Sequence, residues 1–249
     1  MLSKNTVKFI KSLHQKKYRT ESGMFFVEGE KSVLEVLDSD FLIEMLLITE
    51  AFEQKHGTPL QFFTGKIERI TQNQLEQLGQ YQSNDSALAV VKMKENRAFS
   101  PAAGEWTLAL DEVRDPGNLG TIIRIADWYG IKRLVFSPQT AEFYNPKVIQ
   151  ATMGSFTRVE FFYENLGEVF ARWRQPVYGA FLDGKNIHTL QNALPGVILM
   201  GNESKGISQE SGHWVTEKVT IPGFGRAESL NVAIATAILC DNFIRISLQ

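Results

Sequence analysis

Residues 115–124 read DPGNLGTIIR, and they follow the apolar run WTLALD after three residues, EVR, near the middle of the chain. Two similar arrangements come later, with MGNESKG at residues 200–206 and IPGFGRAESLN at residues 221–231. Each segment follows a predicted strand and leads into a stretch of helical character. Open α/β sheets bind their ligands in loops at the carboxyl ends of parallel strands. The three segments therefore predict one composite site.

The apolar runs of the second half are predicted strands, and helical segments separate most of them. They cover residues 106–111, 133–136, 158–162, 177–182, 197–201 and 218–222. Alternating strands and helices indicate a mostly parallel sheet that is covered on both faces. The last predicted helix, residues 230–247, is apolar over much of its surface, so we expect it to be buried in the core or against a partner.

The first half predicts a smaller α/β domain. Its expected strands are residues 24–29, 43–49, 61–64 and 87–93, and its expected helices are residues 30–37 and 71–79. A polar stretch containing Ser, Pro and Ala at residues 96–104 is typical of a linker. The predicted organisation is a domain over residues 1–95, this linker, and a second domain over residues 105–249.

The composition limits the classes of function. With 249 residues and a net charge of −2, the chain has no overall positive charge that would favour nucleic acid. Its single cysteine, Cys240, excludes an intrachain disulfide and a cysteine-based metal site, and we expect it to be a small core residue. No apolar run approaches the length of a membrane span or a signal sequence. These features predict a soluble, cytoplasmic protein with no membrane partner.

One local charge pattern differs from the average. Between residues 4 and 19 the chain has six cations and no acidic residue: Lys4, Lys8, Lys11, Lys16, Lys17 and Arg19. This run is a candidate surface for RNA phosphates. The alternative is a solvated first helix whose charged face has no ligand, which charge alone favours.

The common cofactor motifs fit poorly. GFGRAE begins like a dinucleotide fingerprint, but Glu228 stands where the third glycine belongs. GNESKG has two glycines at the spacing of a phosphate-binding loop, but Ile207 follows in place of Lys and Ser or Thr. The four histidines have no metal-ligand spacing, so no metal is expected.

Few titratable groups remain in the three segments. Arg124 lies on the helix that begins near Asn118, and it either serves a site or pairs with Asp127 or Asp111. Ser229 and Asn231 either belong to the site or simply cap the last helix.

The three segments resemble the three motifs of the SpoU (TrmH-type) RNA 2′-O-ribose methyltransferases of the SPOUT superfamily. These motifs are Asn-x-Gly with Arg four residues later, Gly-x-Glu-x-x-Gly, and Ile-Pro followed by Ser-Leu-Asn-Val. The matching residues are Asn118, Gly120 and Arg124; Gly201, Glu203 and Gly206; and Ile221, Pro222 and residues 229–232. The likeness covers residues 106–249, and FVEGEKSVLEVL at residues 26–37 resembles the opening of the family's L30e-like substrate-binding domain.

The resemblance implies a deep trefoil knot in the second domain and S-adenosylmethionine (AdoMet) as cofactor. Backbone groups of Gly201, Ile221 and Leu230 would hold its adenine and ribose beside Gly206, and Leu199 and Leu230 would sandwich the adenine. It also implies a homodimer in which the arginine acts near the partner's cofactor. An L30e-like domain favours ribosomal RNA over tRNA as substrate, because simpler tRNA enzymes of the family often lack it.

The same resemblance assigns the catalytic roles. A free guanidinium is not a base near neutral pH, so we expect Arg124 to stabilise the developing alkoxide. Asn118 would orient the ribose, Glu203 would hold the loops or Arg124, and Ser229 and Asn231 would fix the third loop.

One departure from the family pattern is the third loop, where Gly223 to Ala227 replace the Met and shorter basic pattern of many relatives. Arg226 in this loop either contacts RNA phosphate or is an exposed loop charge. Two other classes of function compete with the methyltransferase: a non-catalytic RNA-binding or ribosome-assembly factor, and a nucleotide-dependent oxidoreductase.

Overall fold

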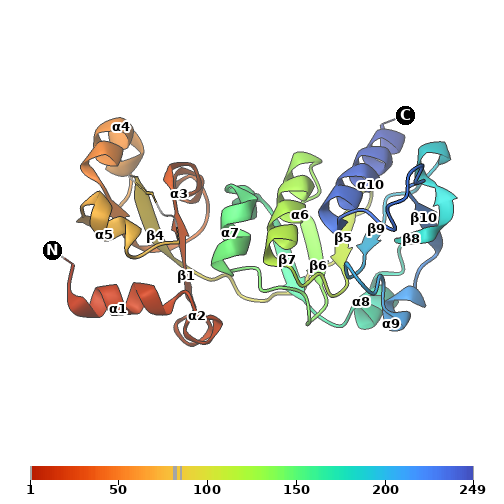
Figure 1. The fold of residues 1–249 in the computed structure, drawn as a ribbon, viewed down its shortest axis with the longest axis horizontal. Helices are drawn as coiled ribbons and strands as arrows, with labels where there is room; N and C mark the ends of the chain where they lie inside the picture. Colours follow the sequence, from red (N-terminus) through yellow and green to blue (C-terminus); the bar gives the residue numbers. More distant parts are fainter. Residues whose placement is uncertain (1, 81–82, 85, 249) are drawn as a thin grey trace. The chain divides into compact units, whose positions relative to one another are not determined.

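The computed structural model describes residues 2–80, 83–84 and 86–248, and the chain divides into two compact units (Figure 1). The first unit comprises Met1–Glu95 together with Phe143–Thr157. The second comprises Asn96–Glu142 and Arg158–Gln249.

The first unit is built on a four-stranded sheet in the order β1-β4-β2-β3. These strands are β1 (Met24–Glu28), β2 (Ile43–Ile48), β3 (Lys66–Arg69) and β4 (Ala87–Lys92). Strand β4 is antiparallel to β1 and β2, whereas β3 is parallel to β2. The helices of this unit are α1 (Lys4–Ser12), α2 (Lys16–Ser22), α3 (Glu30–Leu37), α4 (Glu50–Gln61), α5 (Gln72–Glu76) and α7 (Pro146–Thr152).

The predicted strand at residues 61–64 is wrong. Gln61 ends α4, and the strand lies further on, at Lys66–Arg69. The apolar residues of the predicted strand fall in the turn after α4, where Phe62 is 81% exposed. Two adjacent apolar residues do not show whether apolar positions recur with the spacing of a strand or of a helix. They are therefore weak support for a strand.

Strand β1 is covered on both faces. Phe26 packs in a core with Ile10 and Leu13 at the α1 end of the chain. Its neighbour Phe25 contacts the rings of Phe41, Tyr144 and Phe156, with centroids 5.9, 4.5 and 6.0 Å away. Because side chains alternate along a strand, the two phenylalanines supply two separate cores.

The segment 143–157 therefore belongs to the first unit, although the sequence placed it in the second domain. Tyr144 also accepts a hydrogen bond from the backbone N–H of Lys94, at 2.9 Å, and burial raises the pKa of its phenol. Aromatic burial against Phe25 explains the difference.

The structure also corrects one member of the predicted cationic surface. Arg19 is only 1% exposed, and its Nη1 donates a hydrogen bond of 2.8 Å to the carbonyl of Leu13 at the end of α1. Arginine often pairs with the unsatisfied carbonyls at a helix C-terminus, and here this role turns the side chain inward. The remaining five cations are exposed: Lys4, Lys8, Lys11, Lys16 and Lys17.

The second unit contains a six-stranded sheet in the order β10-β8-β9-β5-β6-β7, and every ladder between neighbours is parallel. The mostly parallel sheet predicted for this half is confirmed. Its strands are β5 (Thr107–Leu110), β6 (Arg133–Phe136), β7 (Glu160–Tyr163), β8 (Val177–Asn186), β9 (Val197–Met200) and β10 (Glu217–Thr220).

Helices cover both faces of this sheet, as Figure 1 shows. α6 (Pro116–Trp128) and α10 (Val232–Ser247) pack together on one face, with α8 (Leu166–Trp173) and α9 (Gln209–Gly212) on the other. Two short 3-10 helices, η1 (Ser155–Arg158) and η2 (Ile187–Thr189), are the remaining secondary-structure elements of the described residues. The inner side of α10 is buried, because Phe243 packs against the rings of Trp106 and Tyr178 at 4.8 Å each.

The stretch predicted to be a linker is held against the second unit. It has no helix or strand, but Asn96 exchanges two hydrogen bonds with the backbone of Tyr163, at 3.1 and 2.7 Å. Phe99 packs edge-on against Phe162 with centroids 4.7 Å apart. Within the described ranges, no helix has the length and apolarity needed to cross a membrane.

Candidate functional site

The first predicted loop joins β5 to α6. Asp115 caps α6 by accepting a hydrogen bond from the Asn118 backbone N–H at 2.8 Å, and Pro116 follows at the first helical position. Pro has no N–H to satisfy there, so the sequence DPGN starts the helix at a fixed point. Gly120 is buried inside α6, whereas Arg124 is exposed one turn further on.

Arg124 is available for a ligand. The two carboxylates considered as its partners are already engaged: Asp127 is held by Arg158, with N–O distances of 2.9 to 3.1 Å, and Asp111 accepts a hydrogen bond from the Ser208 backbone at 2.8 Å. Among the described residues, none forms an ion pair or hydrogen bond with the Arg124 guanidinium. The interpretation of Arg124 as half of a structural ion pair is therefore wrong.

The second loop follows β9 and is crowded. A Cβ on Gly201 would lie 2.2 Å from the backbone carbon of Gly206 and 2.3 Å from the nitrogen of Ile207. Gly206 has a φ of 70° and exchanges two backbone hydrogen bonds of 2.9 Å with Asn202. Gly201 is therefore required so that the loop can fold back on itself. From the sequence, only a contact of the Gly201 backbone with the cofactor was expected.

Asn202 holds the second loop against the first. Its side-chain oxygen accepts hydrogen bonds from the backbone N–H groups of Ser204 and Lys205, at 2.9 and 3.0 Å. Its nitrogen donates a hydrogen bond of 2.8 Å to the carbonyl of Glu112. Glu112 has a φ of 57°, a conformation that costs a non-glycine residue about 1 kcal/mol or more. The sequence did not point to Asn202 or Glu112, because neither the turn at Asn202 nor the backbone strain at Glu112 leaves a local pattern of residues.

Asn118 joins all three loops through its side chain. Its amide nitrogen donates to the Glu203 carboxylate at 3.0 Å, and its oxygen accepts from the Asn231 amide at 2.9 Å. The Asn231 oxygen then accepts from the backbone N–H groups of Ala233 and Ile234, at 2.9 and 3.3 Å, and so caps α10. The composite site predicted from the three segments is therefore a connected set of hydrogen bonds.

The direction of these hydrogen bonds is fixed by chemistry. An ionised carboxylate only accepts, so the nitrogen of Asn118 must face Glu203. The oxygen of Asn118 then faces Asn231, which must present its own nitrogen there and its oxygen to the helix N-terminus. Only one orientation of both amides satisfies every group.

The third loop, between β10 and α10, is open to solvent. Gly223 through Asn231 are exposed, Ile221 and Pro222 are half-buried, and Leu230 is 49% exposed. Within the described part of the chain, the backbone N–H groups of residues 223–230 have no protein acceptor. Ser229 and Arg226 are exposed, and Asn231 is the residue that caps α10. Unpaired backbone donors beside an exposed leucine fit a ligand with both polar and apolar parts.

Leu199 does not line this site. Its side chain is 0% exposed and packs in a core with Val169 and Phe170 of α8, because β9 is covered on both faces. The prediction that it sandwiches an adenine ring is therefore wrong.

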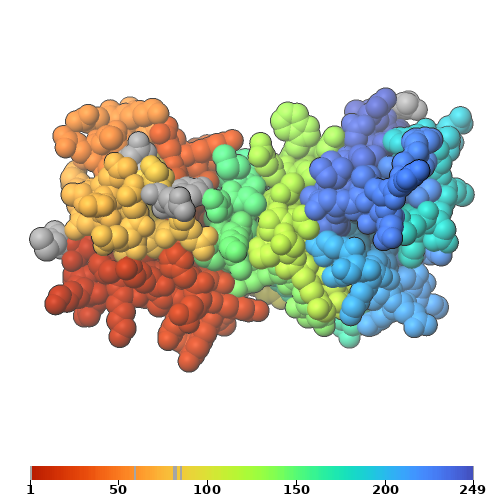
Figure 2. Space-filling view, in the orientation of Figure 1, coloured from red at the N-terminus to blue at the C-terminus, as the bar shows by residue number. Residues whose placement is uncertain are grey.

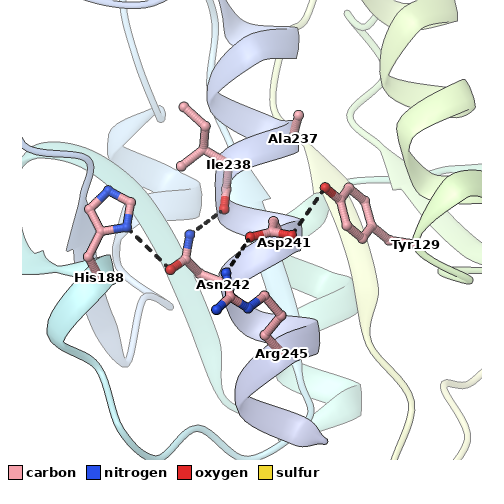
Figure 3. Close-up of a pocket in the computed structure, with 7 residues that line it drawn as sticks. All are labelled: Tyr129, His188, Ala237, Ile238, Asp241, Asn242 and Arg245. Atoms are coloured by element: carbon pink, nitrogen blue, oxygen red, sulfur yellow. Dashed lines mark hydrogen bonds and ion pairs between the residues drawn. The ribbon is translucent and has the colours of Figure 1, made fainter.

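A shallow hollow of about 400 Å³ lies away from the loops, on the outer side of α10 (Figure 3). Tyr129, which directly follows α6, donates a hydrogen bond of 3.5 Å to Asp241, and burial, with a contribution from Asp241, raises the pKa of the Tyr129 phenol. His188, Asn242 and Arg245 complete its polar wall, and Ala237 and Ile238 are its apolar residues. None of the three motifs reaches it. Across the described ranges, no group of three or more His, Cys, Asp or Glu side chains could hold a metal ion.

Comparisons with known proteins agree with this arrangement of motifs. The model of the SpoU rRNA Methylase family matches residues 105–241, and the model of an MRM3-like substrate binding domain matches residues 4–89. The chain is 30% identical over 238 residues to the 23S rRNA (guanosine(2553)-2′-O)-methyltransferase RlmP of Bacillus subtilis, covering 94% of this chain and 93% of that protein.

Two solved structures are also similar over nearly the whole chain. One is assigned to the TrmH family of RNA methyltransferases, from Porphyromonas gingivalis, with 36% identity, a TM-score of 0.86, and coverage of 98% of this chain and 99% of that one. The other is an AdoMet-bound rRNA methyltransferase from Sinorhizobium meliloti, with 32% identity, a TM-score of 0.87, and coverage of 98% and 96%. The chain therefore belongs to the SpoU rRNA methylase family.

Proposed function

We propose that this protein is an enzyme that transfers a methyl group from AdoMet to a ribose 2′-OH of RNA, with ribosomal RNA as the substrate. The observation that carries the proposal is the hydrogen-bonded link from Glu203 through Asn118 to Asn231, which unites the three family motifs in one site. The names of the relatives support the substrate class, because the Bacillus subtilis and Sinorhizobium meliloti proteins are both described as rRNA methyltransferases.

The cofactor would lie between the second and third loops. AdoMet supplies a methyl group on a positively charged sulfur, which a nucleophile attacks in line. The unpaired backbone groups of the third loop, with Ile221 and the exposed Leu230, would bind its polar and apolar parts. Gly201 and Gly206 shape the facing wall, because their own backbones fold closely together.

Arg124 would stabilise the negative charge that develops on the ribose oxygen. The guanidinium remains protonated near neutral pH, so it acts by charge and hydrogen bonding, not as a base. Asn118 would hold the ribose, although both ends of its amide are already bonded, so its contact must use remaining lone pairs or exchange with Asn231. Glu203 and Asn231 position this amide, and Ser229 offers a free hydroxyl in the same loop.

The exposed cations of the first unit would bind RNA phosphates. Lys4, Lys8 and Lys11 recur at helical spacing on α1, opposite the buried Ile10. Lys16 and Lys17 follow on α2, where Lys17 is 3.9 Å from Glu21 and 72% exposed. Arg226 of the third loop would add a phosphate contact near the site.

Further features of the family are part of this proposal. The second unit would have its C-terminal chain threaded in a trefoil knot, and the first unit would be an L30e-like RNA-binding domain. A homodimer would form through the outer faces of α6 and α10. Trp128 (84% exposed) and Ile234 (53% exposed) support that surface, because exposed apolar side chains on adjacent helices favour a partner. The protein would act in the cytoplasm.

The test is transfer of labelled methyl from AdoMet into unmodified rRNA and tRNA, with AdoMet binding measured separately by calorimetry. We expect label in rRNA, and we expect Arg124→Ala to lower the transfer rate by about 100-fold or more while AdoMet binding persists. Arg172→Ala is the matched control, because Arg172 is a surface arginine of α8 whose ion pair is with Glu164, just before that helix. Full activity of Arg124→Ala would contradict the mechanism.

Other outcomes separate the competing functions. Label in tRNA alone would keep the chemistry and overturn the substrate. AdoMet binding without transfer into free RNA or ribosomal particles would indicate a non-catalytic RNA-binding or assembly factor. Binding of NAD in place of AdoMet would indicate the oxidoreductase.

A further inference from the structure

Phe224 in the third loop has an unusual degree of exposure. It is 96% exposed, the largest value among the exposed large hydrophobic side chains of the described residues. Leu230 in the same loop is 49% exposed. A phenylalanine has a large area to bury, so a ring with both faces in solvent is unfavourable for the free protein. The C-terminal part of the chain, coloured blue in Figure 2, lies at the surface of the second unit.

The glycines on either side of Phe224 leave space around its ring. A Cβ on Gly223 or on Gly225 would meet no heavy atom within 4 Å, and neither has a φ in the left-handed range. The observed backbone therefore requires neither glycine. Their effect is to remove side chains from both neighbours of the ring and to give the loop freedom to change conformation.

A cation follows the ring at close spacing. Arg226 is exposed, and no described residue forms an ion pair or hydrogen bond with its guanidinium. A free aromatic face beside a free cation is the combination with which proteins bind single-stranded nucleic acid, because each nucleotide offers a base to stack and a phosphate to pair. The same loop ends at Asn231, which is bonded to Asn118.

We propose that Phe224 stacks on a nucleobase of the RNA segment that contains the acceptor ribose, while Arg226 pairs with a neighbouring phosphate. This inference rests on the proposed function and names the part of the substrate that the third loop contacts. Stacking is tolerant of base identity, so the contact holds the nucleotide in place more than it selects the sequence. The side chain of Phe224 is thus an RNA-positioning group, whereas Leu230 and the loop backbone are the groups proposed to hold AdoMet.

The experiment compares Phe224→Ala, Phe224→Leu and Phe224→Trp with the wild type, using fragments of an unmodified large-subunit rRNA transcript that accept methyl. We expect Phe224→Ala and Phe224→Leu to raise the KM for RNA about tenfold, because loss of one base stack has an effect of this order. The dissociation constant for AdoMet should stay within about twofold, because the inference places the ring on the RNA and not on the cofactor. Phe224→Trp should retain the wild-type KM.

A spectroscopic measurement tests stacking directly. The extra tryptophan fluorescence of Phe224→Trp, measured against the wild type, should be quenched when the accepting RNA fragment is added. Phe62→Ala is the control, because Phe62 is another exposed phenylalanine, 81% exposed, and lies in the first unit. This control should leave the KM for RNA and the affinity for AdoMet unchanged.

The outcomes separate this inference from the proposed function. Wild-type transfer with an unchanged KM in Phe224→Ala would overturn the stacking contact and leave the methyltransferase intact. Loss of AdoMet affinity in Phe224→Ala would place the ring on the cofactor, and a shift in oligomeric state would place it on a second copy; either result overturns the inference. No transfer by the wild type to any RNA would instead overturn the proposed function.

Discussion

The second and third loops belong to the same site but are built in opposite ways. In the loop after β9, Gly201 is so closely surrounded by the backbones of Gly206 and Ile207 that a methyl group would not fit. In the loop after β10, Gly223 and Gly225 have open space around them. The second loop is a fixed wall, held by Asn202 and Glu203. The third loop has few contacts apart from the hydrogen bonds of Asn231.

This difference shows that glycines in neighbouring motifs can serve unrelated purposes. A glycine in a tight fold-back is needed for stability, whereas a glycine in an open loop is needed only if the loop must move or leave a surface clear. Substitutions in the two loops should therefore affect different measurements.

The largest effect is expected for Gly201→Ala. The new Cβ would meet backbone atoms that cannot rotate away, so we expect a loss of about 3 kcal/mol in the free energy of unfolding. The melting temperature should then fall by about 6–12 °C for a chain of this size. Gly212→Ala is the control, because its Cβ would come no closer than 3.8 Å to Ile207. An unchanged melting temperature for Gly201→Ala would show that the second loop is not a fixed wall.

An intermediate effect is expected for Asn231→Ala, which removes both the cap of α10 and the hydrogen bond to Asn118. We expect the free energy of unfolding to fall by about 1–2 kcal/mol. Ser229→Ala should change it by less than about 0.5 kcal/mol, because Ser229 forms no such cap. Denaturant midpoints of the two variants make the comparison. Equal values would mean that Asn231 is not the anchor of the third loop.

The smallest effect is expected for Gly225→Ala. Alanine fits the observed backbone and restricts the unfolded chain, so stability should rise by about 0.5 kcal/mol. Differential scanning calorimetry can resolve the sign. A clear destabilisation would show that the third loop is held in a conformation that alanine cannot adopt, and the contrast between the loops would then fail.

Much of the second unit could be predicted because its signals are local. The apolar runs correspond to β5 to β10 within a few residues, and the DPGN and SLNV segments do mark the starts of α6 and α10. Recognition of the motifs also led to the link among Asn118, Glu203 and Asn231, although the hydrogen bonds themselves follow only from the folded arrangement.

Apart from the misplaced strand at residues 61–64, the wrong predictions involve tertiary packing. The charge of Arg19 indicated a surface residue, but its hydrogen bond to Leu13 turns it inward. Leu199 lies at the end of the correct strand, but which face of a doubly covered strand points to a ligand is not encoded in a continuous apolar run. The strain at Glu112 leaves no trace in the sequence at all.

The division of the chain has a consequence for synthesis on the ribosome. Domains tend to fold in order as they emerge, N-terminal first. The first unit here cannot close its aromatic core when residue 95 emerges, because Tyr144 and Phe156, which pack on Phe25, are still to be translated. Completion of that unit therefore waits for residue 157, by which time β5, α6 and β6 of the second unit have already been made. A nascent chain that stops between residues 95 and 157 would therefore present the exposed cations of α1 before the first unit has folded completely.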